Sequence, residues 1–306
     1  DIERGLAAFT GITEVPVPKG FTGTLRPYQK DGLSWLWFLH TYRLGGILAD
    51  DMGLGKTVQL LSLLVKARED DRMERALVVC PVSTMGNWLE ECRRFAPSLR
   101  AEIHAGPGRA GGPEDLKPAE VYLISYATLA NDIRWLAELR FDYLVLDEAQ
   151  AVKNPRSKRR KAAAHIRADH RIALTGTPVE NSIVELWSIV DLLVPGILGS
   201  KNSFSARYAR GEGDVGRETL ENLLKPLVLR RTKGAAAPDL PEKEEITLST
   251  EMESRQARVY KGLRGRFEAE VDYTIARKGL GGAGIKILEA MLRLRQAALL
   301  PVLADP

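Results

Sequence analysis

The sequence predicts an α/β fold, a parallel sheet with helices on both faces, followed by a mostly helical segment. Short apolar runs alternate with helical patterns from about residue 26 to 194, and no repeat of fixed period is visible. Several apolar runs lack a polar position for a solvent-facing side, as expected for strands covered on both faces. The predicted strands are 46–49, 76–80, 101–104, 121–124, 143–146 and 171–174.

The helices between these strands follow from apolar spacing and from start signals. Pro27 suits a first helical turn, and Ser83 and Asn181 can accept hydrogen bonds from the free N–H groups of a helix start. The predicted helices are 27–40, 56–68, 84–95, 126–138, 156–167 and 182–193.

After about residue 195 the alternation stops. Glycine and proline predict loops at 104–118 and 209–218, and "KGAAAPDLPEKEE" (233–245) is typical of a linker. From residue 250 onward the pattern is helical, and "GLGGAG" (279–284) is expected to divide it into two helices.

The composition is that of a folded globular protein. Of the 306 residues 44% are hydrophobic and 27% charged, and 44 basic against 40 acidic residues give a net charge of only +4, a weak hint of a polyanionic partner. Cys80 and Cys92 cannot form a disulfide framework or a zinc site, so we expect buried thiols in a reducing compartment. No membrane span or secretory signal is recognisable, and the start at Asp1 suggests a piece of a longer chain.

"DDMGLGKT" (50–57) is a candidate phosphate-binding loop between a strand and a helix. Gly53 and Gly55 permit positive φ and close backbone approach, Lys56 would contact β- and γ-phosphates, and the Thr57 hydroxyl would bind Mg²⁺. Asp50 stands where the usual pattern has a glycine, and we expect it to act as a turn residue through hydrogen bonds to its own backbone. The alternative is an ordinary glycine-rich turn. The predicted nucleotide-binding residues of the loop are Asp51, Met52, Gly53, Leu54, Gly55, Lys56 and Thr57.

Two carboxylates follow the apolar strand in "FDYLVLDEAQ" (141–150). Parallel strands present their C-terminal ends at one edge, so Asp147 could hold Mg²⁺ and Glu148 could polarise an attacking water. By itself, such a pair is also typical of a solvated strand end. Together with the loop at 50–57 it indicates a phosphoryl-transfer site.

Two further places carry polar side chains of interest. Thr175, Gly176 and Thr177 follow another predicted strand and could relay the state of a γ-phosphate to a bound polymer, or could simply form a strand-to-helix turn. Gln29 could bind an adenine edge through its amide, although an isolated glutamine is usually a surface residue.

The order and spacing of these motifs resemble the first lobe of superfamily-two helicases, and specifically the SWI/SNF-type DNA translocases. The resemblance covers about residues 21–303. The shared motifs are "LRPYQ", "GGILADDMGLGKT", "LVVCPVSTMGNW", "LISYATL", "LVLDEAQ" and "LTGTP". The stretches that resemble this family rather than strand-separating helicases are "NSIVELWSIVDLLVPGILGS" (181–200), "KPLVLRRTK" (225–233) and "LRLRQAALLPVL" (292–303).

The resemblance implies an N-terminal extension at 1–20, a first RecA-like ATP-binding lobe at 21–200, and a helical insertion with a linker at 201–306. It implies ATP and Mg²⁺ as cofactors and a second RecA-like lobe whose arginine fingers complete the site, so this chain is expected to bind ATP but hydrolyse it poorly. Gln150 replaces the histidine of many members and could contact the γ-phosphate through its amide, and Asp51 replaces the usual glutamate. Both the composition and Gln150 favour a bacterial source, hence a cytoplasmic, nucleoid-associated protein, or a nuclear one if eukaryotic.

The implied partner is double-stranded DNA, held through its phosphates. The implied DNA-contacting or coupling residues are Ser83, Asn87, Ser125, Tyr126, Thr175, Gly176 and Thr177. A basic run at 156–161 could also bind DNA, although a solvated helix face is the simpler interpretation. A second hypothesis is a nucleotide-responsive docking module on a transcription or nucleoprotein complex, and a strand separator is disfavoured by the three family-specific stretches.

Overall fold

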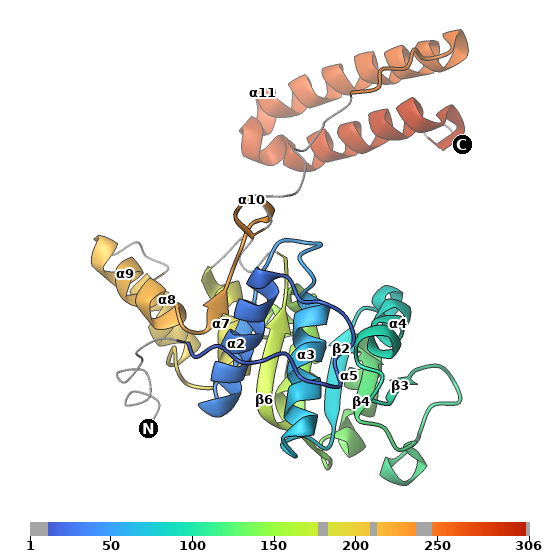
Figure 1. Cartoon of the computed structure of the whole chain (residues 1–306). Helices are drawn as coiled ribbons and strands as arrows, with labels where there is room; N and C mark the ends of the chain where they lie inside the picture. The colour runs from blue at the N-terminus through green and yellow to red at the C-terminus, as the bar shows by residue number, and fades with distance from the viewer. Residues whose placement is uncertain (1–11, 177–182, 209–212, 237–246, 304–306) are drawn as a thin grey trace. The chain divides into compact units, whose positions relative to one another are not determined.

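The computed structural model describes residues 12–176, 183–208, 213–236 and 247–303. In these residues a seven-stranded sheet, parallel throughout, has the order β3-β4-β2-β5-β6-β1-β7 (Figure 1). The predicted α/β class with a parallel sheet is therefore confirmed. The strands are β1 (Gly46–Leu48), β2 (Ala76–Cys80), β3 (Ala101–His104), β4 (Val121–Ser125), β5 (Arg140–Asp147), β6 (Arg167–Leu174) and β7 (Val228–Leu229).

The register of the central strands aligns their C-terminal ends. Leu174 of β6 pairs with Asp147 of β5 on one side and with Leu48 of β1 on the other. Leu229 of β7 pairs with Leu48 in turn. The chain therefore leaves four neighbouring strands in one row, and the loops that follow them share one edge of the sheet.

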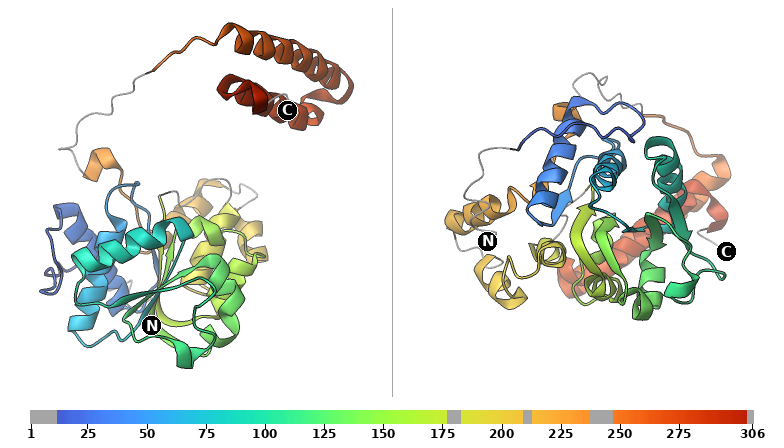
Figure 2. Two further views of the ribbon diagram at one scale, coloured as in Figure 1. Left: turned by 90° about the vertical axis from the view of Figure 1, so that its right-hand side faces the viewer. Right: turned by 60° about the horizontal axis from the view of Figure 1, so that its bottom comes forward.

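Helices cover both faces of the sheet, as the alternating pattern predicts (Figure 2). The strands all run in the same direction, so the chain must cross over one face or the other between successive strands, and most of the helices lie in these crossovers. On one face lie α2 (Pro27–Thr41), α3 (Lys56–Glu69) and α4 (Met85–Phe95). On the other lie α5 (Tyr126–Leu136), α6 (Lys158–His165) and α7 (Ile183–Leu193).

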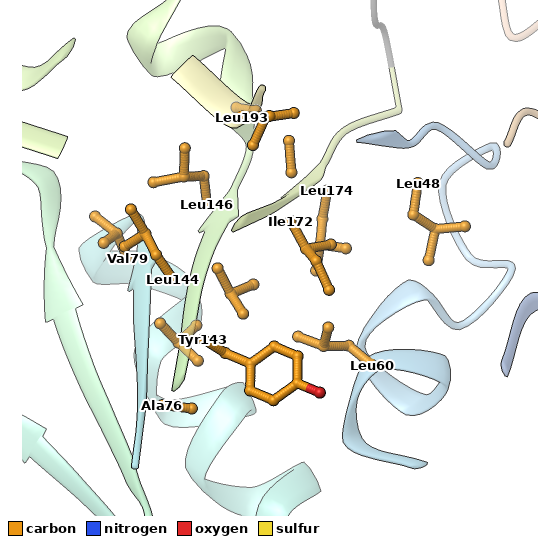
Figure 3. Packing of buried hydrophobic residues seen from close by; sticks show 14 of the residues in the cluster. Leu48, Leu60, Ala76, Val79, Tyr143, Leu144, Leu146, Ile172, Leu174 and Leu193 are labelled. Carbon is orange, nitrogen blue, oxygen red and sulfur yellow. The ribbon is translucent and has the colours of Figure 1, made fainter. Parts of the chain in front are cut away.

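The core is formed where these helices meet the sheet. Tyr143 of β5 lies beside Leu60 of α3, Leu146 of β5 lies nearer Leu193 of α7, and all of them are buried (Figure 3). A methyl group on Gly46 would lie 2.4 Å from Leu39 of α2, so only glycine lets this helix approach β1 so closely. Cys80 and Cys92 are free and buried, and burial raises the pKa of each thiol to about 12.

The structure corrects several local predictions. β7 was not expected, and the predicted loop at 209–218 is helical from Gly213, because α9 (Gly213–Leu224) buries Leu220 and Leu224 on one face. The predicted linker begins with a short helix, α10 (Lys233–Ala236). β5 and β6 start three and four residues earlier than predicted, and α8 (Lys201–Tyr208) follows α7.

The contacts divide the chain into two units, Asp1–Pro241 and Glu242–Pro306. The second unit consists of α11 (Ser254–Leu299), which is interrupted at Gly279 (φ 69°), and of the short helix η4 (Pro301–Leu303). Gln256 in the first half donates to Ala298 O in the second half at 2.8 Å, so the predicted division into two helices is observed. None of the helices in the described ranges is long and apolar enough to cross a membrane. The predicted boundaries at residues 20 and 200 stay a prediction.

Candidate nucleotide-binding site

The loop at 50–57 lies between β1 and α3, at the shared edge of the sheet. Gly53 (φ 88°) and Gly55 (φ 73°) both have positive φ, and a methyl group on Gly55 would lie 2.6 Å from Gln29 Nε2. Lys56 is the first residue of α3, and its ammonium folds back into the loop, donating to Asp50 O at 2.7 Å and Asp51 O at 3.3 Å. The loop thus surrounds a cation at a helix N-terminus, an arrangement suited to an anion.

Burial lowers the pKa of Lys56, and four nearby carboxylates partly reverse that effect. The largest of these contributions comes from Glu148, followed by Asp50 and Asp147. Lys56 therefore lies within electrostatic reach of both acids of the "DEAQ" motif, as the shared sheet edge requires.

Asp50 does not have the role expected from the sequence. Its carboxylate is fully buried and accepts hydrogen bonds from Arg231 Nε (2.9 Å), Arg231 Nη2 (2.5 Å) and Gln59 Nε2 (3.1 Å). The expectation of a turn residue bonded to its own backbone is wrong, because a buried carboxylate needs a charged partner. Asp50 instead attaches the loop to the segment that follows β7.

Asp147 ends β5 with both carboxylate oxygens engaged. Oδ2 accepts from Trp88 Nε1 of α4 at 2.8 Å, and Oδ1 accepts from the Glu148 backbone N–H at 3.0 Å. Tyr126 OH donates to Asp147 O at 2.7 Å. Burial raises the pKa of Asp147, and the Trp88 hydrogen bond and Lys56 oppose that shift. The carboxylate is therefore fixed in orientation inside the lobe.

A hydrogen-bonded chain leads from Glu148 to the neighbouring strand. Glu148 has φ 48°, which is strained for a residue with a side chain. Gln150 Nε2 donates to Glu148 Oε2 at 2.6 Å, and Thr175 Oγ1 donates to Gln150 Oε1 at 3.1 Å. Thr175 N also donates to Leu48 O at 3.1 Å, beside the phosphate loop. The ends of β5 and β6 are thus connected through side chains, and a backbone hydrogen bond connects β6 to β1.

Thr57 has a neighbour that the sequence did not indicate. Its side chain lies near Glu91 of α4; burial and Asp147 raise the pKa of Glu91, and Thr57 lowers it. Among the described residues, Glu91 Oε2 is buried without a hydrogen-bond partner. Thr57, Glu91 and Asp147 therefore gather oxygen atoms at one place.

These oxygen atoms fit a magnesium ion that arrives with a nucleotide. Mg²⁺ prefers oxygen ligands and usually takes one or two from the protein, with the rest from phosphates and water. The described part of the chain contains no cluster of three or more His, Cys, Asp or Glu side chains able to hold a metal alone. The hydroxyl of Thr57 and the carboxylate of Asp147 suit such a shared site.

Gln29 and Gly176 lie beside the loop, and Met52 belongs to it. The Gln29 amide is occupied within the protein, since its oxygen accepts from Arg26 N at 2.9 Å and its nitrogen donates to Leu54 O at 3.2 Å. Met52 is 69% exposed at the loop tip, and a methyl group on Gly176 would lie 3.0 Å from Met52 Cγ. Adenine recognition by Gln29 stays a prediction.

The predicted DNA-contacting residues fall into two groups. Ser83 and Asn87 are exposed around the start of α4. Ser125 and Tyr126 are buried, Ser125 as the cap that accepts from Thr128 N at 3.0 Å. Thr177 lies outside the described residues. In this structure the exposed candidates are those near α4.

Three residues around the site were missed in the sequence. Arg231 belongs to "LRRTK", which the sequence marks only by its family resemblance, and Trp88 and Glu91 lie three positions apart on α4, on one helix face. For Trp88 and Glu91, the sequence signal was their three-residue spacing in the helix predicted after the strand at 76–80. For Arg231, 181 residues from Asp50, no local pattern existed.

These features define a RecA-like ATPase lobe: a parallel α/β sheet whose one edge carries a glycine-rich loop, a lysine at a helix N-terminus and an acidic pair at a strand end. The chain belongs to the SNF2-related domain family, which matches residues 28–302. The predicted resemblance to the first RecA-like lobe of SWI/SNF-type proteins is confirmed.

Relatives in several organisms match most of this chain. It is 38% identical to the Bacillus subtilis protein named "Putative ATP-dependent helicase/translocase YwqA", over 96% of this chain and 32% of the relative. It is 34% identical to the TATA-binding protein-associated factor MOT1 of Saccharomyces cerevisiae, over 94% of this chain and 17% of that protein. The chain thus spans about a third or less of these relatives.

A solved structure shares the fold. The Sulfolobus solfataricus SWI2/SNF2 ATPase core in complex with dsDNA superimposes with a TM-score of 0.69 at 36% identity, over 94% of this chain and 62% of that one. The same core domain solved separately gives a TM-score of 0.68 at 37% identity.

Proposed function

We propose that this chain is the ATP-binding lobe of an ATP-dependent double-stranded DNA translocase. The observation that carries the proposal is a chain of hydrogen bonds that joins three strand ends. Gln150 bonds both Glu148 and Thr175. The backbone N–H of Thr175 donates to Leu48 O beside the phosphate loop. Such a chain can transmit the state of a bound phosphate across the sheet edge. ATP and Mg²⁺ are the proposed cofactors.

Each residue has a role that its position allows. Lys56 exchanges its loop carbonyl partners for the β- and γ-phosphates, and the loop N–H groups hold the same oxygens. Mg²⁺, when bound by Thr57 and Asp147, neutralises charge that develops on the phosphates. Glu148 orients the attacking water and accepts its proton, while Gln150 holds the Glu148 carboxylate in place.

Hydrolysis needs a second lobe. Members of the family supply arginine side chains from a second RecA-like lobe, and this chain spans about a third of its Bacillus subtilis relative. We therefore propose that residues 1–306 bind ATP and turn it over poorly, whereas the parent protein is a DNA-dependent ATPase.

Double-stranded DNA is the proposed track. The Sulfolobus solfataricus ATPase core, which is 36% identical to this chain, has been solved in complex with dsDNA. Ser83 and Asn87 expose hydrogen-bonding groups near α4, where they can meet phosphate oxygens. Contacts of this kind carry no sequence code, so the expected DNA binding weakens steeply with salt.

The test is ATP hydrolysis by the parent protein with duplex DNA, single-stranded DNA or RNA. Duplex-selective stimulation that is lost in Lys56→Ala supports the translocase. Equal stimulation by single-stranded RNA would overturn the substrate, and robust duplex-stimulated turnover by residues 1–306 would overturn the need for a second lobe.

The second candidate is a nucleotide-responsive docking module on a transcription or nucleoprotein complex. The observation in its favour is the 34% identity to a protein named as a TATA-binding protein-associated factor. Partner binding that persists in Lys56→Ala, together with no turnover on any nucleic acid, would favour this module over the translocase.

A further inference from the structure

We propose that α4 belongs to the nucleotide site, with Trp88 and Glu91 as positioning residues for the two magnesium ligands Asp147 and Thr57. The inference rests on the proposed function, since it assumes that those ligands bind Mg²⁺ with ATP. It adds two residues that touch neither the nucleotide nor the ion directly. Their separation of three positions puts both on the same face of α4.

Trp88 holds one oxygen of Asp147. The indole Nε1 donates to Oδ2 at 2.8 Å, and the ring is only 2% exposed, so it cannot turn to another partner. The backbone N–H of Glu148 holds the other oxygen at 3.0 Å. Two donors on two oxygens fix the plane of the carboxylate, and a carboxylate with a fixed plane presents its remaining lone pairs in set directions.

Glu91 lies beside Thr57. A threonine hydroxyl that coordinates a cation must direct its lone pairs at the ion and its hydrogen elsewhere. The Glu91 carboxylate is the neighbouring acceptor for that hydrogen, since its Oε2 is buried and has no partner among the described residues. Glu91 would therefore set the orientation in which Thr57 acts as a ligand.

The unpartnered oxygen of Glu91 also points to a group that arrives with the nucleotide. Oε2 is buried and has no hydrogen-bond partner among the described residues, and the carboxylate interacts with Asp147. Buried polar atoms are almost always hydrogen-bonded, so an unmatched acceptor next to Thr57 and Asp147 calls for a donor. A water molecule of a hydrated Mg²⁺ is a donor of the required kind.

The structure also separates this role from simple packing. Trp88 and Glu91 are polar or charged at the atoms that face Asp147 and Thr57, whereas Leu89 and Cys92 of the same helix supply apolar surface. A helix that only packed on the sheet would need neither the indole N–H nor the carboxylate. Glu90, the exposed neighbour, serves as a matched control.

The experiment is a Mg²⁺ titration of nucleotide binding by the 306-residue chain. A fluorescent, non-hydrolysable ATP analogue is bound first in EDTA and then at increasing Mg²⁺, with wild type, Glu91→Gln, Trp88→Phe and Glu90→Gln compared. We expect all four to bind equally in EDTA within about twofold. Glu91→Gln and Trp88→Phe should need about 10-fold more Mg²⁺ for half-saturation, and Glu90→Gln should match wild type.

The outcomes separate the two proposals. If wild type shows no Mg²⁺-dependent binding of the analogue, both the proposed function and this inference fail. If wild type depends on Mg²⁺ and Glu91→Gln and Trp88→Phe follow the same titration curve, only the positioning role is overturned. Circular dichroism establishes folding, and Glu91→Asp, which keeps the carboxylate, should recover part of the Mg²⁺ affinity that Glu91→Gln loses.

Discussion

Arg231 and Asp50 form a two-pronged ion pair, with Nε 2.9 Å from Oδ1 and Nη2 2.5 Å from Oδ2, although 181 residues separate them. Arg231 also donates to Gln59 Oε1 at 2.7 Å, and its backbone carbonyl accepts from Asp51 N at 3.0 Å. The segment after β7 is therefore attached to the phosphate loop at several points.

Arg231→Ala should destabilise the N-terminal unit by about 3–5 kcal/mol, because it leaves the fully buried Asp50 carboxylate without its charged partner. Urea unfolding monitored by tryptophan fluorescence measures this change. All five tryptophans lie in residues 35–187, so the signal reports on this unit alone. Exposed Arg230→Ala is the matched control and should cost less than about 0.5 kcal/mol.

A double-mutant cycle isolates the pair itself. Arg231→Ala with Asp50→Asn should cost clearly less than the sum of the two single changes, since the neutral amide no longer needs a cation. Additive effects would mean that Arg231 stabilises the unit through packing alone.

Gly32→Ala should destabilise the protein, against the usual gain of about 1 kcal/mol for this change within a helix. A methyl group at position 32 would lie 1.8 Å from Gln59 Oε1 and 3.0 Å from Arg231 Nη2, within the Asp50 network. Thermal unfolding followed by tryptophan fluorescence should show a lower midpoint. Gly86→Ala in α4, with no atom within 4 Å, should leave the midpoint unchanged or raise it. Equal unfolding midpoints for the two variants would contradict the close packing of Gly32 against Gln59 and Arg231.

Gln150→Ala should lower the rate of ATP hydrolysis by the parent protein with duplex DNA by about 10-fold or more, while ATP affinity changes less than about threefold. The reason is that Gln150 positions the carboxylate of Glu148 and bonds Thr175, but the loop holds the phosphates without it. Steady-state turnover checks the expected loss of rate, and equilibrium ATP binding by the same preparation checks the expected affinity. A loss of affinity equal to the loss of rate would instead make Gln150 a nucleotide-binding residue.

Acid should destabilise the N-terminal unit through His40. Its pKa is lowered to about 4 by burial, with His170 and Arg72 adding to the shift, and its Nδ1 lies 2.7 Å from Tyr143 OH. The unfolded chain has the ordinary value near 6.5 and binds the proton first. The contribution of neutral, buried His40 to the free energy of unfolding is therefore fully present above pH 6.5. It is lost as the pH falls from 6.5 towards 4, by at most about 3 kcal/mol.

Urea unfolding at pH 7, 6 and 5 checks this sign. His40→Gln should flatten the loss of stability between pH 6.5 and 4, and His165→Gln, at an exposed histidine, should leave it unchanged. If the free energy of unfolding of His40→Gln falls with pH as steeply as that of wild type, other groups cause the loss of stability in acid. His170, whose pKa is also lowered by burial, is then the first residue to substitute.

The elements predicted correctly are those that a local sequence pattern specifies. Six of the strands were predicted from apolar runs, and Gly279 interrupts α11 where its sequence indicated. β7 escaped prediction because its two residues are too few for a period. The polar starts of β5 and β6 escaped because Arg140 and Arg167 lie at exposed strand ends, where no apolar pattern is needed.

The candidate site divides in the same way. Lys56, Asp147 and Glu148 were predicted because each follows a strand whose end must lie at the shared edge. The role of Asp50 was misjudged because its partner Arg231 is distant in sequence. Trp88 was overlooked because an apolar ring beside a strand is ordinarily interpreted as core, although its N–H reaches Asp147.

The most direct test of the proposed site is a crystal structure of this chain with Mg²⁺ and a non-hydrolysable ATP analogue. We expect terminal phosphates against Lys56 Nζ, with the ion between the Thr57 hydroxyl and the Asp147 carboxylate. Phosphates bound away from Lys56, or an ion with no contact to Thr57 and Asp147, would contradict the proposed site.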